Sequence, residues 1–490
     1  MFGKTKKTIV VLLLAAILAG CGGGTAETER QTSGADTTGG AAAETVAETE
    51  TEAADPVADR DFGGATFQIT TSQSGTQHYL FTVTELTGDV LNDALYNRTK
   101  AIEDKFNIVF AADNVESDAF GAATVFINAV QAGDTTYDLA MLLERRAFTM
   151  AQEGYFTDAK TLPGVQLDQP WWMGEVNDTI NFGDARYITY GSANLGFYDL
   201  THVLLFNKHM ATNLGLADPY ELVLSGGWTF DKFAEMARAA IQDVNGDGAF
   251  GTEDIYGYVG GSNMLLMNFV TAARCRTIER TADGAKIELL ADTRIADVCE
   301  KVANTVWETG FWYTKSESSN NYYLTDTYFQ DDQALFADHT FYSACLLRDM
   351  ASDFGIIPFP KFDEAQERYG SVAEAGSRIT TVPAVVKDAE LVGAVLEMMH
   401  YLSYRDVIPA YYETTLKQKV SRDSVSAQML DLILENIYYD LGATMFNDAI
   451  KDGILSPYLM GSRTDYASRV EKNLPTIEKA ITDAGGVVVQ

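Results

Sequence analysis

The sequence predicts an α/β protein, in which the strands of a parallel sheet alternate with helices. Residues 65–71 have the pattern of a strand, 89–106 of a helix, 108–111 of a strand, 124–132 of a helix and 137–143 of a third strand. This alternation is typical of a parallel sheet covered by helices. Because ligands of such sheets bind at the carboxyl ends of the strands, residues that follow the third strand are candidates for a binding site.

The helix over 89–106 has the clearest periodicity. Its apolar residues recur three and four positions apart and can share one face; they are Val90, Leu91, Leu95, Ile102 and Phe106. Further strands are expected at 187–190, 203–206, 255–258, 334–336 and 354–357, a further helix at 229–242, and mainly helices after Asp388.

The composition is that of a folded, acidic protein. The chain has 490 residues, 46% of them hydrophobic, with 25 Phe and 24 Tyr, enough for one large or two mid-sized cores. The formal net charge is −33. This charge repels nucleic acid and anionic lipid, so we expect neither to be a partner.

The N-terminus has the three parts of a secretory signal. Lys4, Lys6 and Lys7 precede an apolar run at 9–18, which is shorter than the roughly 20 residues that span a bilayer. The run ends in Leu-Ala-Gly-Cys, which resembles the bacterial lipobox, whose cysteine is lipidated and becomes the new N-terminus. We therefore expect a signal peptide over 1–20 and a lipid on Cys21. An ordinary cleaved signal with an incidental cysteine is the alternative.

Residues 22–60 are expected to be a disordered tether. The segment has no aromatic residue and consists largely of Thr, Ala, Glu and Gly, so it cannot bury enough apolar surface to order itself. Together with a lipid on Cys21, this predicts a protein on the cell surface, held to the outer face of the cytoplasmic membrane by its lipid alone. The three other cysteines, Cys275, Cys299 and Cys345, have no metal-type spacing and fit either core positions or one disulfide with a free thiol.

Six short stretches occur in a fixed order over residues 61 to about 440. They are GDVLNDA from Gly88, GD from Gly133 with YDL from Tyr137, DQPWW from Asp168, LFNK from Leu205, GWTF from Gly227 and GIIPFPK from Gly355. Together, and behind a lipobox, they resemble the bacterial extracellular solute-binding protein family 1, the maltose-binding-like class.

That resemblance implies a two-lobed clamp of the type II periplasmic-binding-protein kind, each lobe a mixed sheet flanked by helices. A ligand that touches both lobes stabilises the closed form, which the permease of an ABC importer recognises. The implied ligand is a carbohydrate, most simply an oligosaccharide, and the implied state is a monomer without enzymatic activity. By likeness, the N-terminal lobe comprises 61–196 and 376–420, and the C-terminal lobe 197–375 and 421–490.

Candidate ligand residues in the first lobe follow the third strand and the first crossing between lobes. Glu144, Arg145 and Arg146 lie where family members place polar ligand contacts, and the planar arginine fork suits paired hydroxyls or a carboxylate. Tyr198 and Asp199 lie at the crossing, where a carboxylate can accept sugar hydroxyls. The alternatives are arginines that pair with surface acids, and a hinge-packing tyrosine beside a solvated aspartate.

Candidates in the second lobe are mainly aromatic. An aromatic face stacks on the C–H face of a sugar ring, and an amide satisfies its hydroxyls. These candidates are Asn263, Trp312, Phe341 or Tyr342, and Tyr439 or Tyr438. Ordinary core packing is the alternative for each aromatic residue, and it is the expected role of Trp171, Trp172 and Trp228.

Residues 243–254 match the register of an EF-hand calcium loop. Oxygen ligands stand at positions 1, 3, 5 and 12, a glycine at the sharp turn of position 6, and a backbone carbonyl at position 7. These residues are Asp243, Asn245, Asp247, Asp254, Gly248 and Ala249. We expect structural Ca²⁺ here, of modest affinity because aspartate replaces the usual bidentate glutamate. A metal-free turn is the alternative.

No catalytic motif stands in a fitting context, and the five histidines show no metal-like spacing. Two other functions stay open: a lipid-anchored carbohydrate-active enzyme such as a glycoside hydrolase, which needs only two carboxylates, and a calcium-dependent scaffold-binding protein.

Overall fold

The computed structural model describes residues 55–72, 83–115, 119–282, 284–313, 327–347, 350–414 and 424–489. The predicted signal, Cys21 and the tether up to residue 54 lie outside the described residues. The chain divides into two compact units, Met1–Ala58 and Asp59–Gln490, and the fold below is that of the second. In the described part of the chain, no helix is both long and apolar enough to cross a membrane.

The first sheet has four strands in the order β11-β3-β1-β2. β1 (Ala65–Ser72) pairs in parallel with β2 (Ile108–Val115) and with β3 (Leu139–Leu143). This confirms the predicted parallel arrangement. β11 (Arg378–Thr381) was not predicted; it pairs antiparallel with β3 after a long excursion of the chain.

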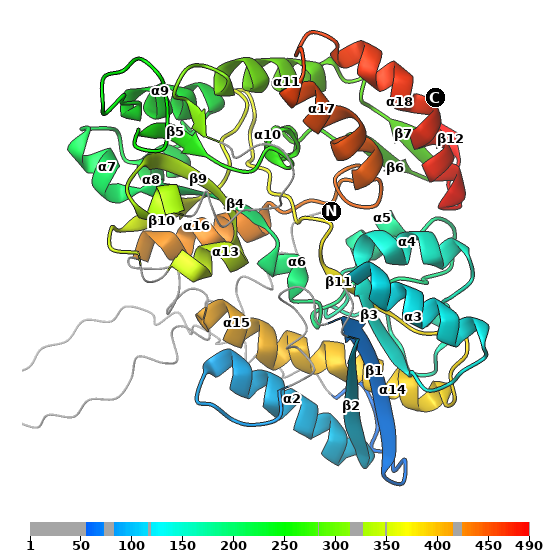
Figure 1. The fold of residues 1–490 in the computed structure, drawn as a ribbon. Helices are drawn as coiled ribbons and strands as arrows, with labels where there is room; N and C mark the ends of the chain where they lie inside the picture. The colour runs from blue at the N-terminus through cyan, green and yellow to red at the C-terminus, as the bar shows by residue number, and fades with distance from the viewer. Residues whose placement is uncertain are drawn as a thin grey trace, which may run out of the picture. The chain divides into compact units, whose positions relative to one another are not determined.

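Two helices connect the parallel strands, α2 (Val90–Phe106) and α3 (Ala119–Gln131). α2 begins where the Asp89 side chain accepts a hydrogen bond from the Asn92 amide, and it ends at Asn107, whose φ of 49° is left-handed. Its buried face carries most of the predicted apolar residues, but Val90 is 36% exposed because it lies in the first turn, outside that face. α14 (Ala389–Leu402) and α15 (Ile408–Thr414) lie beside α2 although they are far away in sequence (Figure 1).

The second sheet is mixed, with the order β10-β4-β9-β5-β8. β4 (His202–Asn207) pairs antiparallel with β9 (Ala334–Thr340) and with β10 (Phe354–Ile357). β5 (Tyr256–Val259) pairs in parallel with β9 and with β8 (Trp312–Tyr313). β6 (Ile278–Thr281), β7 (Gly284–Ile287) and β12 (Val488–Val489) form a small third sheet in the order β12-β7-β6.

An aromatic core packs beneath α9 (Phe230–Ala240), which begins at the Thr229 cap. Trp228 is fully buried, and its indole N–H donates to the Pro358 carbonyl over 3.0 Å. The Phe233 ring lies 5.1 Å from that of Phe336 on β9, centroid to centroid. Trp228 is therefore a structural residue, as predicted.

The remaining helices surround these sheets. They are η2 (Ala159–Thr161), α4 (Glu144–Gln152), α5 (Gly174–Ile180), α6 (Gly196–Asp199), α7 (Lys208–Asn213), α8 (Pro219–Leu224), α10 (Leu265–Ala272), α11 (Thr293–Val306), α13 (Phe341–Leu346), η4 (Ser403–Val407), α16 (Ser424–Glu435), η6 (Asp448–Leu455), α17 (Ser456–Met460) and α18 (Tyr466–Asp483). Cys275 and Cys299 are buried free thiols.

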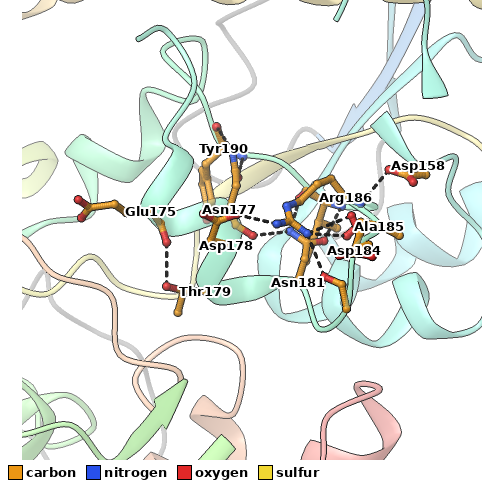
Figure 2. A network of polar contacts seen from close by, with 12 residues as sticks. Asp158, Glu175, Asn177, Asp178, Thr179, Asn181, Asp184, Ala185, Arg186 and Tyr190 are labelled. Carbon is orange, nitrogen blue, oxygen red and sulfur yellow. Dashed lines mark hydrogen bonds and ion pairs between the residues drawn. The ribbon is translucent and has the colours of Figure 1, made fainter. Parts of the chain in front are cut away.

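The strand predicted at 187–190 is wrong. Only Thr189 pairs there, in an isolated bridge with Thr380. Figure 2 shows the cause: the Asn177 side chain takes both backbone groups of Tyr190, accepting from its N–H over 2.6 Å and donating to its carbonyl over 2.9 Å. Asn181 likewise donates to the Ile188 carbonyl. Side chains of α5 thus occupy the groups that a strand would use.

Candidate functional site

The site is built from Glu144, the first residue of α4, directly after the carboxyl end of β3. Its backbone N–H donates to the Ser377 carbonyl over 3.0 Å, next to β11. The sheet therefore fixes the position of Glu144, whose surface is only 1% exposed. Its carboxylate accepts a hydrogen bond from the Tyr439 hydroxyl.

Burial dominates the electrostatics of this carboxyl group. It raises the pKa of Glu144 to about 7, although hydrogen bonding from Tyr439 and Tyr190 and the charge of Arg145 act in the opposite direction. The Tyr190 and Tyr439 rings meet edge to face, with centroids 6.4 Å apart. Glu144 therefore gains or loses its proton near neutral pH, in contact with two tyrosine side chains.

Tyr439 reaches Glu144 from a segment that is fastened to a different part of the fold. The Asp440 carboxylate accepts from the N–H of Thr277 over 2.9 Å and from its hydroxyl over 2.6 Å, just before β6. Arg276 donates to the Tyr439 carbonyl over 3.1 Å. The contact between Tyr439 and Glu144 therefore links the first sheet to the part of the fold that contains β6.

A second contact links the same two parts of the fold, the first sheet with α4 and the part that contains β6 and η6. Arg145 forms an ion pair with Asp448 of η6 at 3.0 Å. Arg145 and Arg146 both place their guanidinium carbon 5.9 Å from the centroid of the Phe120 ring. The predicted residues Glu144, Arg145 and Tyr439 thus meet in one region, with Arg146 at its edge.

Tyr198 and Asp199 lie in α6, one turn before β4. Asp199 is buried and accepts from the Tyr411 hydroxyl over 2.8 Å, so the alternative of a solvated aspartate is wrong, while its role as a ligand residue stays a prediction. Burial raises the pKa of Tyr198 to about 12, and its ring lies 6.2 Å from that of Tyr411. Both residues pack against α15, which joins the crossing segment to the helices of the first sheet.

A buried polar network at the start of β4 was missed by the sequence analysis. His202 Nδ1 lies 3.0 Å from the Asp338 carboxylate at the end of β9, and Nε2 lies 3.6 Å from that of Glu374. Asn268 donates to the other Asp338 oxygen over 2.9 Å. Burial alone lowers the pKa of His202, but the two carboxylates outweigh it and raise the pKa to about 9. No motif marks this network, because its members come from separate elements.

Three second-lobe candidates lie in other surroundings. Trp312 is 8% exposed and donates its indole N–H to the Gly260 carbonyl, and Phe341 is 2% exposed with its backbone N–H bound to Thr201. Protein therefore covers both aromatic faces, which matches the core-packing alternative. The Asn263 side chain accepts from the following N–H, of Met264, over 3.0 Å.

Trp171 and Trp172 are packing residues, as expected. Both are buried, and both donate their indole N–H to the carboxylate of Glu397 on α14, over 2.8 and 3.1 Å. These two hydrogen bonds connect the segment after residue 168 to α14, which lies beside α2.

In the predicted calcium loop, side-chain oxygens accept hydrogen bonds from backbone N–H groups of the same loop. Asp243 accepts from the N–H groups of Gly246 and Gly248, Asn245 from Asp247, and Asp247 from Ala249. Asp254 is buried and accepts from Val244 and Gly251. Gly248 has a φ of +81°, which a glycine adopts at no cost. Within the described ranges, no group of three or more His, Cys, Asp or Glu side chains is placed to hold a metal ion.

Comparison with known proteins agrees with the resemblance described in the sequence analysis. Residues 102–335 match the bacterial extracellular solute-binding proteins. This stretch is similar to that family. No curated protein matches the chain.

The fold of this chain is similar to that of solved two-lobed type II periplasmic binding proteins. UgpB from Mycobacterium tuberculosis, in complex with glycerophosphocholine, is 15% identical, with a TM-score of 0.56 over 86% of this chain and 98% of that one. An ABC transporter solute-binding protein from Thermotoga lettingae, bound with alpha-D-tagatose, is 16% identical, with 0.54 over 85% and 100%. The GacH receptor of Streptomyces glaucescens is 12% identical, with 0.53 over 86% and 99%.

Proposed function

We propose that this protein is the extracytoplasmic substrate-binding lipoprotein of an ABC importer and that it binds a carbohydrate, specifically an oligosaccharide, between its two lobes. The family match supports the binding role. The Thermotoga protein is described with a sugar and GacH with acarbose and an acarbose homolog, which supports a polyhydroxylated ligand. UgpB is described with glycerophosphocholine, so the sugar panel below includes that compound.

The observation that carries this proposal is the contact between Glu144 and Tyr439. The Tyr439 hydroxyl donates a hydrogen bond to the Glu144 carboxylate, and the two residues come from different parts of the fold. A sugar hydroxyl can replace the Tyr439 hydroxyl as the donor, and a second one can accept from Tyr439. The Arg145–Asp448 pair offers the same exchange at a more exposed position. Such a site orients hydroxyl groups with charged acceptors and donors.

A thermal-shift screen against mono- and oligosaccharides, polyols and glycerophosphocholine tests the proposal. A ligand at about 100 times its Kd should stabilise the fold by about 2.7 kcal/mol. Glu144→Ala should abolish the shift of the active compound, whereas Glu175→Ala, a change on α5, should leave it intact. The absence of any shift, or a shift that survives Glu144→Ala, contradicts the proposal. Products released from the sugar would instead identify the enzyme alternative.

We also propose the lipid anchor on Cys21, supported by the lipobox-like sequence. Cys21→Ala should release the protein from the membrane fraction into the medium and abolish labelling by a radioactive fatty acid. Retention of the label in the variant contradicts the anchor.

The third part of the proposal is structural Ca²⁺ in the 243–254 loop, supported by its EF-hand register. Addition of Ca²⁺ to chelator-treated protein should raise Tm, and Asp243→Ala with Asp247→Ala should remove the increase. An equal increase in the double variant would place the ion elsewhere. Calcium-dependent capture of another protein, without a sugar response, would favour the scaffold-binding alternative.

A further inference from the structure

Two arginines lie over the ring of one tyrosine on this acidic protein, and a third arginine is near the first of them. The guanidinium carbon of Arg274 lies 4.9 Å from the centroid of the Tyr438 ring, and that of Arg276 lies 5.4 Å from it. Arg368 is close enough to act electrostatically on Arg274: burial, and then the charges of Arg368 and Arg276, lower the pKa of Arg274. We call these four residues the arginine patch. It is a local exception in a chain whose net charge is −33.

The three guanidinium groups bind neutral acceptors. Arg274 donates to the Tyr369 carbonyl over 3.0 Å, and Arg276 to the Tyr439 carbonyl over 3.1 Å. Arg368 donates to the Asn436 side chain and to a backbone carbonyl. Among the residues that the structure describes, no carboxylate forms an ion pair with any of the three arginines.

Other surface arginines of this chain behave differently. Arg238 forms two hydrogen bonds with the Glu308 carboxylate, over 2.6 and 2.7 Å, and Arg405 binds Asp406 in the same way. Each guanidinium has five N–H donors, so the arginines of the patch keep donors available. Arg276 and Arg368 are exposed and Arg274 is half-buried, so an outside group can reach them.

We propose that the arginine patch is a docking surface for a carboxylate-rich segment of the importer's membrane subunit. Like charges held together repel, and an anionic partner removes that cost. The planar fork of arginine binds carboxylates in a bidentate manner, and Tyr438 holds two of the forks in place by cation–π contact. The strong negative charge of the chain as a whole disfavours an anionic membrane surface as the occupant.

The location of the patch supports a partner that senses the ligand-bound form. Tyr438 belongs to the patch, and the next residue, Tyr439, contacts Glu144 in the other part of the fold. Arg276 binds the Tyr439 carbonyl directly. A partner that engages the patch therefore holds the segment that also contributes to the proposed ligand site. This inference rests on the proposed importer function.

Fluorescence anisotropy with a labelled hexaglutamate peptide tests the patch on the purified full chain at low ionic strength. The double variant Arg274→Gln, Arg276→Gln should bind the peptide about tenfold more weakly or worse, because two charge-assisted contacts are lost. Glutamine keeps an amide donor for the backbone carbonyls, and an unchanged Tm checks that the fold is intact. The matched control, Arg238→Gln with Arg405→Gln, removes the same charge from arginines that already have carboxylate partners.

The control should bind the peptide like the unmodified protein. Absence of peptide binding by the unmodified protein, or an equal loss in the control, overturns the patch as a docking surface. Binding to phosphatidylglycerol vesicles in place of the peptide, abolished by the patch variant, overturns it in favour of a membrane contact. Sugar uptake by cells should fall in the patch variant. A protein that binds no sugar would instead refute the proposed function, whatever the peptide result.

Discussion

Glu144 is an ionisable residue that is almost completely buried. We therefore expect the free energy of unfolding to depend on pH. Its pKa in the folded protein is about 7, above its ordinary value. The protonated form is therefore favoured by folding: the stabilisation is fully present below the unfolded pKa and is lost as the pH rises toward 7. The shift corresponds to about 3 kcal/mol, since one pKa unit is about 1.4 kcal/mol.

Glu144→Gln should remove this dependence, because glutamine keeps an oxygen that can accept from Tyr439 but cannot ionise. Urea unfolding at pH 4.5 and pH 7.5 measures it. We expect the variant to have a similar free energy of unfolding at the lower pH and a higher one than the unmodified protein at the upper pH. Parallel changes in both proteins would contradict the pKa assigned to Glu144.

His202 should give a second pH dependence in a higher window. Its folded pKa of about 9 is raised by Asp338 and Glu374, against the effect of burial. The stabilisation is therefore complete below the unfolded pKa near 6.5 and is lost as the pH rises through 9. NMR titration of the His202 ring checks the value directly. A midpoint near 6.5 for His202 would contradict the network.

Single residues show how far the sequence could predict the site. The position of Glu144 after the third strand follows from local pattern, as does its candidacy. Its partner Tyr439 lies 295 positions away, and no local pattern connects the two. The network of His202, Asp338 and Asn268 was missed for the same physical reason: buried polar groups must be satisfied, but their partners come from separate elements.

The helix α2 allows a test at the scale of one element. The Asp89 side chain caps it by accepting from the Asn92 N–H over 2.9 Å. Asp89→Ala should lower the free energy of unfolding by about 1 kcal/mol, and Asp89→Asn, which keeps the acceptor, by much less. Urea unfolding of both variants checks this. Equal losses would show that charge, and not the capping bond, is what matters.

Elements with strong local signals were predicted well, and elements defined by distant partners were not. The cap and periodicity of α2 are local, and so is the β1-α2-β2 alternation. β11 forms because it completes the edge of β3, and the 187–190 segment fails to become a strand because Asn177 takes its backbone groups. Tertiary contacts decided both cases.

In the whole molecule, the hydrogen bond from Tyr439 to Glu144 links two parts of the fold, and its donor hydroxyl can be removed by a single substitution. Tyr439→Phe deletes the donor to the buried Glu144, at a cost of about 1–3 kcal/mol for the acceptor left unsatisfied. We expect the ligand-free variant to favour a more open form, with a larger radius of gyration in small-angle X-ray scattering. Saturating ligand should reduce the difference.

Tyr458→Phe is the matched control, because the Tyr458 hydroxyl binds a carbonyl only five positions away, that of Arg463. It makes the same chemical change without touching the contact between the two parts of the fold. An identical radius of gyration for both variants and the unmodified protein would show that Tyr439 does not hold these parts together.

The proposed function is the binding of a polyhydroxylated solute between the two lobes without chemical change to the solute. Titration calorimetry of the compound identified by the thermal-shift screen, followed by recovery of that compound, tests it most directly. We expect one saturable site per chain, lost in Glu144→Ala, and the compound recovered intact. Heat that continues as turnover, with a cleaved product in the recovered sample, would contradict it.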